Sequence, residues 1–128
     1  MKKLIYLFLL TIAFVSCEAQ QKTGTELVSP KQFSTAMAKD KGQLIDVRTP
    51  KEYNAGHIDG ATNIHLYDQD FKARINKLDK DQTVYVYCKA GGRSAEAVES
   101  LKINGFKHIV ELDGGTDAWT EAGKPLQK

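Results

Sequence analysis

The chain has few cysteines, prolines and tryptophans: its 128 residues include only Cys17 and Cys88, three prolines and one tryptophan. It has no Cys-x-x-Cys pair, and its three histidines do not have metal-ligand spacing, so neither a zinc site nor a set of disulfides is expected. The formal net charge is only +2, from 18 basic and 16 acidic residues. This balance offers no basic surface for phosphates, and nucleic-acid binding is therefore not expected.

Long apolar runs are also scarce, and the one that stands out spans residues 4–15, directly after Lys2 and Lys3. It is too short for an ordinary transmembrane helix but has the length of a signal-peptide hydrophobic region. We therefore predict a signal peptide over residues 1–17 and an exported protein. Without the two N-terminal lysines, 16 basic residues face 16 acidic ones, so the mature domain is formally neutral.

Two cleavage sites are compatible with this signal peptide. Residues 14–17 resemble a bacterial lipobox, in which Cys17 is lipidated and becomes the mature N-terminus, although Phe14 departs from the usual leucine. Cleavage after Ala19 would instead give a soluble secreted or periplasmic protein. We favour the lipobox, which predicts a lipid anchor on the periplasmic or outer side of a bacterial cell envelope and a polar tether over residues 18–27.

The remainder, residues 28–128, reads as one α/β domain. Helices are expected after the N-cap Ser29, after the capping box of Thr49 and Glu52, and near 70–78, 92–104 and 116–122. Strands are expected at 44–47, 61–66, 83–87 and 106–112. This alternation predicts a mostly parallel sheet of about five strands with helices on both faces.

Cys88 is the most informative residue, since it follows the apolar run Val84–Tyr87 and opens the loop 88–94, after which a helix begins. Ligands of such folds bind beyond the carboxyl ends of the strands, where loop N–H groups and a helix N-terminus attract anions. Together with Lys89 and Arg93, they favour the nucleophilic thiolate. We therefore expect an accessible, reactive Cys88; the alternative is a small apolar residue that ends a core strand. Export by either route makes it the only unmodified thiol.

Three separated motifs resemble the rhodanese-like family in its single-domain form, across residues 26–126. The first looks like the N-terminal signature, the second like the active-site loop and the third like the C-terminal signature. The N-terminal motif comprises Asp46-Val47-Arg48, Glu52, Gly56-His57-Ile58, Gly60-Ala61 and Asn63-Ile64. The loop motif is Cys88 to Ser94. The C-terminal motif comprises Gly105-Phe106, Val110, Leu112, Gly114-Gly115, Ala118-Trp119 and Gly123-Lys124-Pro125.

The resemblance implies a sulfurtransferase without cofactor or metal. The thiolate of Cys88 would take the outer sulfur of thiosulfate or a similar donor, form a persulfide and pass the sulfur to cyanide or a thiol. Only four residues separate Cys88 from Arg93, whereas related folds that accommodate phosphate or arsenate have one more, so phosphatase activity is disfavoured. A persulfide carrier or protein-binding module, with a protein as sulfur acceptor, remains the alternative.

The resemblance also assigns roles to the loop residues. The substrate-binding set is Lys89, Ala90, Gly91, Gly92, Arg93 and Ser94. Their backbone N–H groups would hold the persulfide, Arg93 would brace the loop, and Lys89 would attract the anionic donor. Ala90 is a departure, because many active members have a hydroxyl residue there.

Other polar residues are expected to support the loop or the fold. Asp46, Arg48 and Glu52 form the expected supporting network, although Glu52 could equally be a helix cap. The histidines His57, His65 and His108 are interpreted as structural residues rather than bases or metal ligands. Trp119 is expected in the core, and Gly114-Gly115 in a turn.

Overall fold

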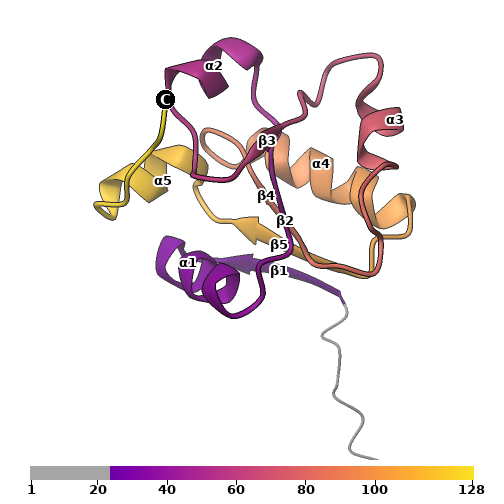
Figure 1. Cartoon of the computed structure of the whole chain (residues 1–128), viewed down its shortest axis with the longest axis horizontal. Coiled ribbons are helices and arrows are strands. Elements are labelled where there is room, and N and C mark those ends of the chain that lie inside the picture. The colour runs from indigo at the N-terminus through magenta and orange to yellow at the C-terminus, as the bar shows by residue number, and fades with distance from the viewer. Residues whose placement is uncertain (1–23) are drawn as a thin grey trace, which may run out of the picture.

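Five parallel strands form a single sheet in the order β1-β5-β4-β2-β3 (Figure 1). The computed structural model describes residues 24–128; the predicted signal peptide and lipobox lie outside them. The strands are β1 Gly24–Val28, β2 Gln43–Asp46, β3 Thr62–Asn63, β4 Val84–Tyr87 and β5 His108–Leu112. The prediction of a parallel α/β sheet is confirmed.

Strand β1 replaces part of the predicted tether. Residues 24–27 were expected to link an anchor to the domain, but they pair in parallel with β5, from Gly24 opposite His108 to Val28 opposite Leu112. Four of the five β1 residues are exposed, so the strand lacks the apolar pattern from which a strand is predicted. Its position is determined by backbone pairing at the sheet edge, which sequence patterning does not report.

Five helices connect and cover the strands: α1 Pro30–Lys39, α2 Pro50–Ala55, α3 Phe71–Ile75, α4 Gly92–Ile103 and α5 Gly115–Glu121. Helices α1 and α2 begin as predicted, each with a capping box and a proline at its first position. At α2, the Thr49 hydroxyl accepts the N–H of Glu52, and the Glu52 carboxylate accepts the N–H of Thr49. These reciprocal bonds fix the position of Glu52 at the start of α2.

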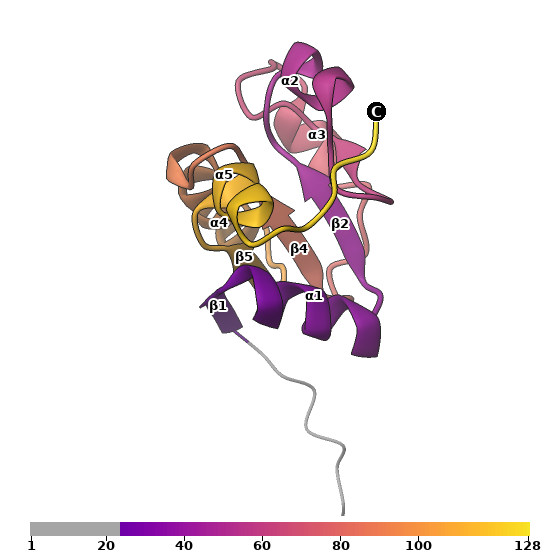
Figure 2. The ribbon, with the colours of Figure 1, turned by 90° about the vertical axis from the view of Figure 1, so that its left-hand side faces the viewer.

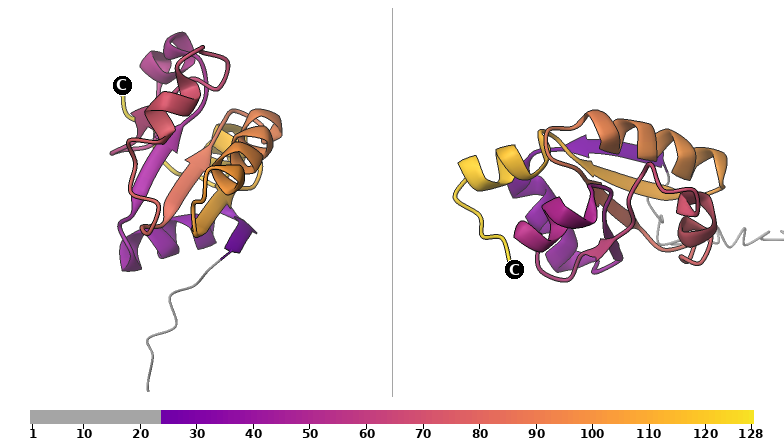
Figure 3. Two further views of the ribbon diagram at one scale, coloured as in Figure 1. Left: turned by 90° about the vertical axis from the view of Figure 1, so that its right-hand side faces the viewer. Right: turned by 90° about the horizontal axis from the view of Figure 1, so that it is seen from above.

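The sheet divides the core into two apolar clusters, one on each of its faces. Figure 3 shows helices on both faces of the sheet. Helices α3 and α4 cover one face, with Ile75 and Leu101 fully buried against it. Helices α1 and α5 cover the other face, where Phe33 contacts Tyr85 and Trp119 edge to face at ring distances of 5.6 and 6.2 Å. Trp119 is therefore a core residue.

Two predicted elements are shorter than expected. The strand expected over 61–66 consists of Thr62–Asn63, although the N–H groups of Ile64 and Leu66 still bond to the carbonyls of Asp46 and Val47. The helix expected over 70–78 ends at Ile75 and continues only as a turn. In both segments the apolar side chains are buried, or partly buried at Leu78, so the hydrophobic pattern predicted burial but not the regular backbone.

The carboxyl ends of the strands meet at one edge, where β2 ends with Asp46 directly opposite Tyr87, the last residue of β4. After α5, the C-terminal segment passes toward α2 (Figure 2), and His57 and Gln127 exchange backbone hydrogen bonds of 2.8 and 2.7 Å. The loop after β4 therefore lies between α2, α4 and α5. Within residues 24–128, no helix is long and apolar enough to cross a membrane.

Candidate active site

The β4–α4 loop holds the thiol of Cys88 against its own backbone. Gly91, the N-cap of α4, has φ 116°, a conformation that glycine adopts without the steric cost of a Cβ. Its N–H points back to the loop and donates a hydrogen bond to Cys88 Sγ at 3.0 Å. A backbone N–H in this position stabilises negative charge on the sulfur.

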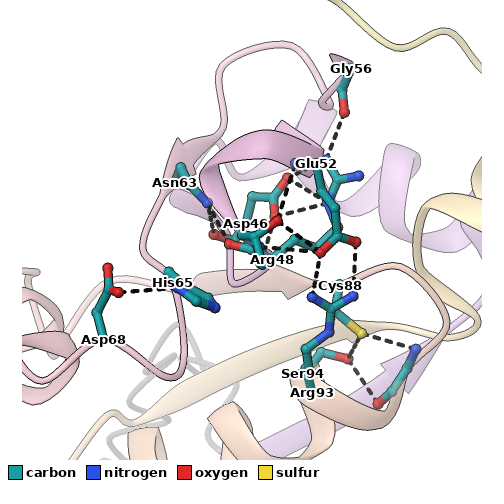
Figure 4. A network of polar contacts seen from close by, with 12 residues as sticks. Asp46, Arg48, Glu52, Gly56, Asn63, His65, Asp68, Cys88, Arg93 and Ser94 are labelled. Carbon is teal, nitrogen blue, oxygen red and sulfur yellow. Dashed lines mark hydrogen bonds and ion pairs between the residues drawn. The ribbon is translucent and has the colours of Figure 1, made fainter. Parts of the chain in front are cut away.

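Cys88 is buried, which corrects the prediction of an accessible thiol. The residue is only 1% exposed and belongs to the apolar cluster beneath α3 and α4. All four residues of β4 are buried, as is usual for a central strand of a parallel sheet, and the residue after the strand remains covered. The sulfur lies inside the loop beside Ser94, not on its outer surface (Figure 4), whereas Ala90 and Gly92 are exposed.

Helix α5 contacts the backbone of the loop, and the sequence analysis missed this contact. The N–H groups of Thr116 and Asp117 donate to the carbonyls of Cys88 and Lys89 at 2.9 and 3.0 Å. Gly115 permits the approach, because a Cβ at this position would overlap the Cys88 carbonyl oxygen. The Gly114-Gly115 turn therefore lies against the backbone of Cys88 and Lys89 as well as reversing the chain.

Both loop cations are engaged in ion pairs. The Lys89 ammonium contacts both carboxylate oxygens of Asp117 at 3.0 Å, and both side chains are more than half exposed. Arg93, at the start of α4, contacts the carboxylate of Glu52. Each cation near the sulfur thus has a protein carboxylate as partner, and the Gly91 N–H is the donor that contacts Sγ directly.

The Arg93–Glu52 pair is bidentate, with N–O distances of 2.7 and 2.9 Å, and it joins α4 to α2 across the mouth of the loop (Figure 4). The hydrogen bond from Arg93 lowers the pKa of Glu52 to about 2, with further lowering by the bonds from Thr49. Glu52 therefore performs both of the roles considered for it, because the same carboxylate caps α2 and binds Arg93.

Asp46 and Arg48 form a buried pair at the end of β2, with 2.6 Å between Nη2 and Oδ2. Arg48 also donates to the Gly56 carbonyl at 2.6 Å, and the Asn63 amide donates to the carbonyls of Asp46 and Arg48. Burial opposes the charge of Arg48, but the hydrogen bond and charge of Asp46 raise its pKa overall. This pair, with Asn63, connects the end of β2 to the end of α2 and to β3.

Ser94 and Glu111 form a second buried contact at the sulfur. Ser94 Oγ lies 3.5 Å from Cys88 Sγ and 2.8 Å from Glu111 Oε2. Ser94 is fully buried and Glu111 is 8% exposed. Glu111 was not predicted as a site residue, since it lies within the apolar strand β5. Its position opposite Val86, two residues before Cys88, is the signal that could have identified it.

The three histidines lie away from the sulfur and make structural contacts. His57 stacks on Tyr53 with ring centroids 3.8 Å apart and bonds to its carbonyl oxygen. His65 contacts Asp68, and His108 contacts Thr83 and Glu26. In residues 24–128, no group of three potential ligands could hold a metal ion.

The fold and the loop together define a class of protein: a parallel α/β domain that carries a cysteine in the loop between a strand and the following helix. Residues 29–122 match the Rhodanese-like domain family model, and the chain belongs to this family.

Individual relatives agree with this assignment. The chain is 46% identical to YqhL of Bacillus subtilis over 79 residues, which cover 62% of this chain and 61% of YqhL. It is 37% identical over 114 residues to MoeZ of Mycobacterium tuberculosis, a probable adenylyltransferase/sulfurtransferase, with 87% of this chain and 29% of MoeZ covered. The chain thus spans less than two thirds of either relative.

The structure is similar to that of a rhodanese-related protein from Thermoplasma volcanium, with a TM-score of 0.70 and 29% identity. The alignment covers 80% of this chain and 97% of the other. The family is therefore established across the whole domain, and not only around the cysteine loop.

Proposed function

We propose that the protein is a sulfurtransferase that carries sulfur as a persulfide on Cys88. The observation that carries the proposal is the position of Sγ inside the loop, in contact with the Gly91 N–H at 3.0 Å. A donor at this point can stabilise both the attacking thiolate and the anionic persulfide that replaces it. Relatedness to MoeZ, a probable adenylyltransferase/sulfurtransferase, supports the same reaction.

The reaction consists of two sulfur transfers. The thiolate of Cys88 attacks the outer sulfur of thiosulfate; a new S–S bond forms, and the sulfur–sulfur bond of the donor breaks with its electron pair on sulfite. Cyanide or a thiolate then attacks the outer sulfur of the persulfide, and Cys88 Sγ leaves as thiolate. Charge and electrons balance in both steps without an external oxidant or reductant.

The size of the loop supports a sulfur substrate over a phosphate. Four residues separate Cys88 from Arg93. Both terminal nitrogens of the Arg93 guanidinium, Nη1 and Nη2, donate to Glu52 and not to the sulfur. A phosphate or arsenate site needs donors for several oxygens around the anion. The loop therefore suits one sulfur atom better than a tetrahedral oxyanion.

The test is sulfur transfer from thiosulfate to cyanide by the wild type and Cys88→Ser, with intact mass measured after thiosulfate alone. We expect turnover and the mass of one added sulfur on the wild type, and neither on the variant. A persulfide without turnover would favour the carrier alternative and a protein acceptor. Absence of sulfur uptake from thiosulfate and from other sulfane donors would refute the proposal.

We also propose that Cys17 is lipidated and anchors the protein at the periplasmic or outer side of a bacterial membrane. The support is the sequence of residues 1–17, with its two lysines, apolar run and terminal cysteine. The mass of the mature protein tests this: a diacylglyceryl-sized gain on Cys17 is expected. An unmodified chain that begins at Gln20 would refute lipidation and favour the soluble exported form.

A further inference from the structure

Glu111 is a buried carboxyl group for which the sulfur-transfer scheme has no use. It lies in β5, is 8% exposed, and makes its side-chain hydrogen bond to Ser94. None of the ion pairs formed within residues 24–128 includes it. A buried carboxylate without a cation is costly, and it is best tolerated where it can take up a proton.

Ser94 connects this carboxyl group to the nucleophile. Its hydroxyl has one proton and three polar neighbours: Glu111 Oε2 at 2.8 Å, the Gly91 carbonyl at 3.1 Å and Cys88 Sγ at 3.5 Å. When Ser94 donates to an ionised Glu111, its lone pairs can accept the S–H of Cys88. When Glu111 is protonated, it can donate to Ser94, and Ser94 can donate to the thiolate.

We propose that Cys88 and Glu111 share one proton through Ser94, so that Glu111 holds the proton while Cys88 is the thiolate. In the transfer, the S–H bond of Cys88 breaks, Ser94 receives that proton and passes its own to Glu111, and an O–H bond forms there. One proton and one negative charge are conserved. The proposal rests on Cys88 as the nucleophile of the proposed function and assigns Glu111 as a positioning residue, because it acts through Ser94.

The charges around Glu111 favour its protonated form. Burial raises its pKa, the Ser94 hydrogen bond opposes this shift, and the charge of Asp113 raises the pKa further. The cations of the loop and of α4 are bound to other carboxylates: Arg93 to Glu52, Lys89 to Asp117 and Lys102 to Glu99. The remaining group next to the carboxyl is the Ser94 hydroxyl.

This arrangement serves both sulfur transfers. In the first, Glu111 keeps the proton that would otherwise make Cys88 an unreactive thiol. In the second, Cys88 Sγ is the leaving group, and the protonated Glu111 supports the developing thiolate through Ser94. The net charge of the pair is the same before and after the cycle, so no proton has to enter from solvent.

The test is the rate of alkylation of Cys88 by iodoacetamide as a function of pH, measured on the full chain by peptide mass spectrometry so that Cys17 is counted separately. If one proton is shared, the thiolate fraction does not depend on pH while the pair holds that proton. The logarithm of the wild-type rate should therefore show a plateau between two rises. Without sharing, the rate would fall about tenfold for each pH unit below a single transition.

Glu111→Gln and Ser94→Ala should each abolish the plateau, the first by removing the proton acceptor and the second by interrupting the connection. The matched control is Glu99→Gln, an exposed acid of α4 paired with Lys102, which should keep the wild-type profile. Circular dichroism at each pH establishes that the variants are folded. At mildly acidic pH we expect wild-type alkylation at least about tenfold faster than that of Glu111→Gln.

A wild-type profile with one transition and no plateau would overturn the proposal even if neither variant folds. A plateau that persists in Glu111→Gln would also overturn it, because another group would then hold the proton. The assay uses no sulfur donor, so its outcome is independent of sulfur uptake from thiosulfate, and a failure here can be distinguished from a failure of the proposed function.

Discussion

The ion pair between Arg93 and Glu52 makes the stability of the loop depend on pH. Glu52→Gln is the informative change, because glutamine can preserve the capping box with Thr49, while it removes the negative charge and one of the two oxygens that accept from Arg93. The variant thus separates the two roles of Glu52. Its effect should be measured as the free energy of unfolding in urea at several pH values.

The magnitude follows from the pKa of Glu52, which falls from 4.5 to about 2 on folding. At about 1.4 kcal/mol per pKa unit, the full shift of about 2.5 units would correspond to about 3.5 kcal/mol. The side chains of Glu52 and Arg93 are 28% and 23% exposed, so solvent screens the pair, and we expect Glu52→Gln to lose about 1–2 kcal/mol at neutral pH.

The sign of the pH dependence is fixed by the direction of the shift. Because folding lowers the pKa of Glu52, its contribution is complete above pH 4.5 and is lost as the pH falls toward 2. The wild type and Glu52→Gln should therefore differ at pH 7 and converge below pH 3. Glu99→Gln, at an exposed pair, should change stability by less than about 0.5 kcal/mol at any pH. A Glu52→Gln difference that does not change between pH 7 and pH 3 would refute the reasoning.

Two further substitutions test how the loop is held. Gly115→Ala should lower the free energy of unfolding by about 2–3 kcal/mol and reduce sulfur uptake, because φ is +59° there and the new Cβ meets the Cys88 carbonyl. The control is Gly123→Ala, where φ is +79° and no atom lies within 4 Å of the new Cβ; it should lower the free energy of unfolding by only about 1 kcal/mol. Equal urea midpoints for the two variants would contradict this. Tyr87→Phe should lower the free energy of unfolding by about 1–3 kcal/mol, because the buried Ile58 N–H loses the hydroxyl oxygen to which it donates at 3.0 Å. An unchanged urea midpoint would show that another acceptor replaces the hydroxyl.

The parts of the fold that depend on patterning could be predicted from the sequence. Ser29-Pro30 and Thr49-Pro50 carry the chemistry of a helix start within a few residues, and both starts are found where they were expected. The run Val84–Tyr87 consists of valine and tyrosine only, and all four residues are buried, as is usual for a central strand of a parallel sheet. Strand β1 could not be predicted, because its polar residues are held by pairing with β5, far away in the sequence.

The same distinction applies to the site. Cys88 and the loop around it form one continuous segment, so the spacing from Cys88 to Ser94 was sufficient to predict a strand, a loop and a helix in that order. The burial of Cys88 could not be predicted in this way, because it results from the apolar cluster beneath α4 and from the packing of α5 against the loop backbone. Arg93 was expected to brace the loop, but the residue that it contacts, Glu52, lies 41 residues away and could not be assigned from the loop segment alone.

The distribution of charge around Cys88 explains why a residue as distant as Glu111 can matter. Lys89 and Arg93, the cations nearest in sequence, are each bound to a carboxylate, so they contribute less to the stabilisation of a thiolate than their number suggests. The groups in direct contact with Sγ are the Gly91 N–H and the Ser94 hydroxyl. The Gly91 N–H donates in every protonation state, whereas the direction of the Ser94 hydroxyl depends on Glu111. The protonation of a carboxyl group on β5 therefore decides whether the second contact favours the thiol or the thiolate.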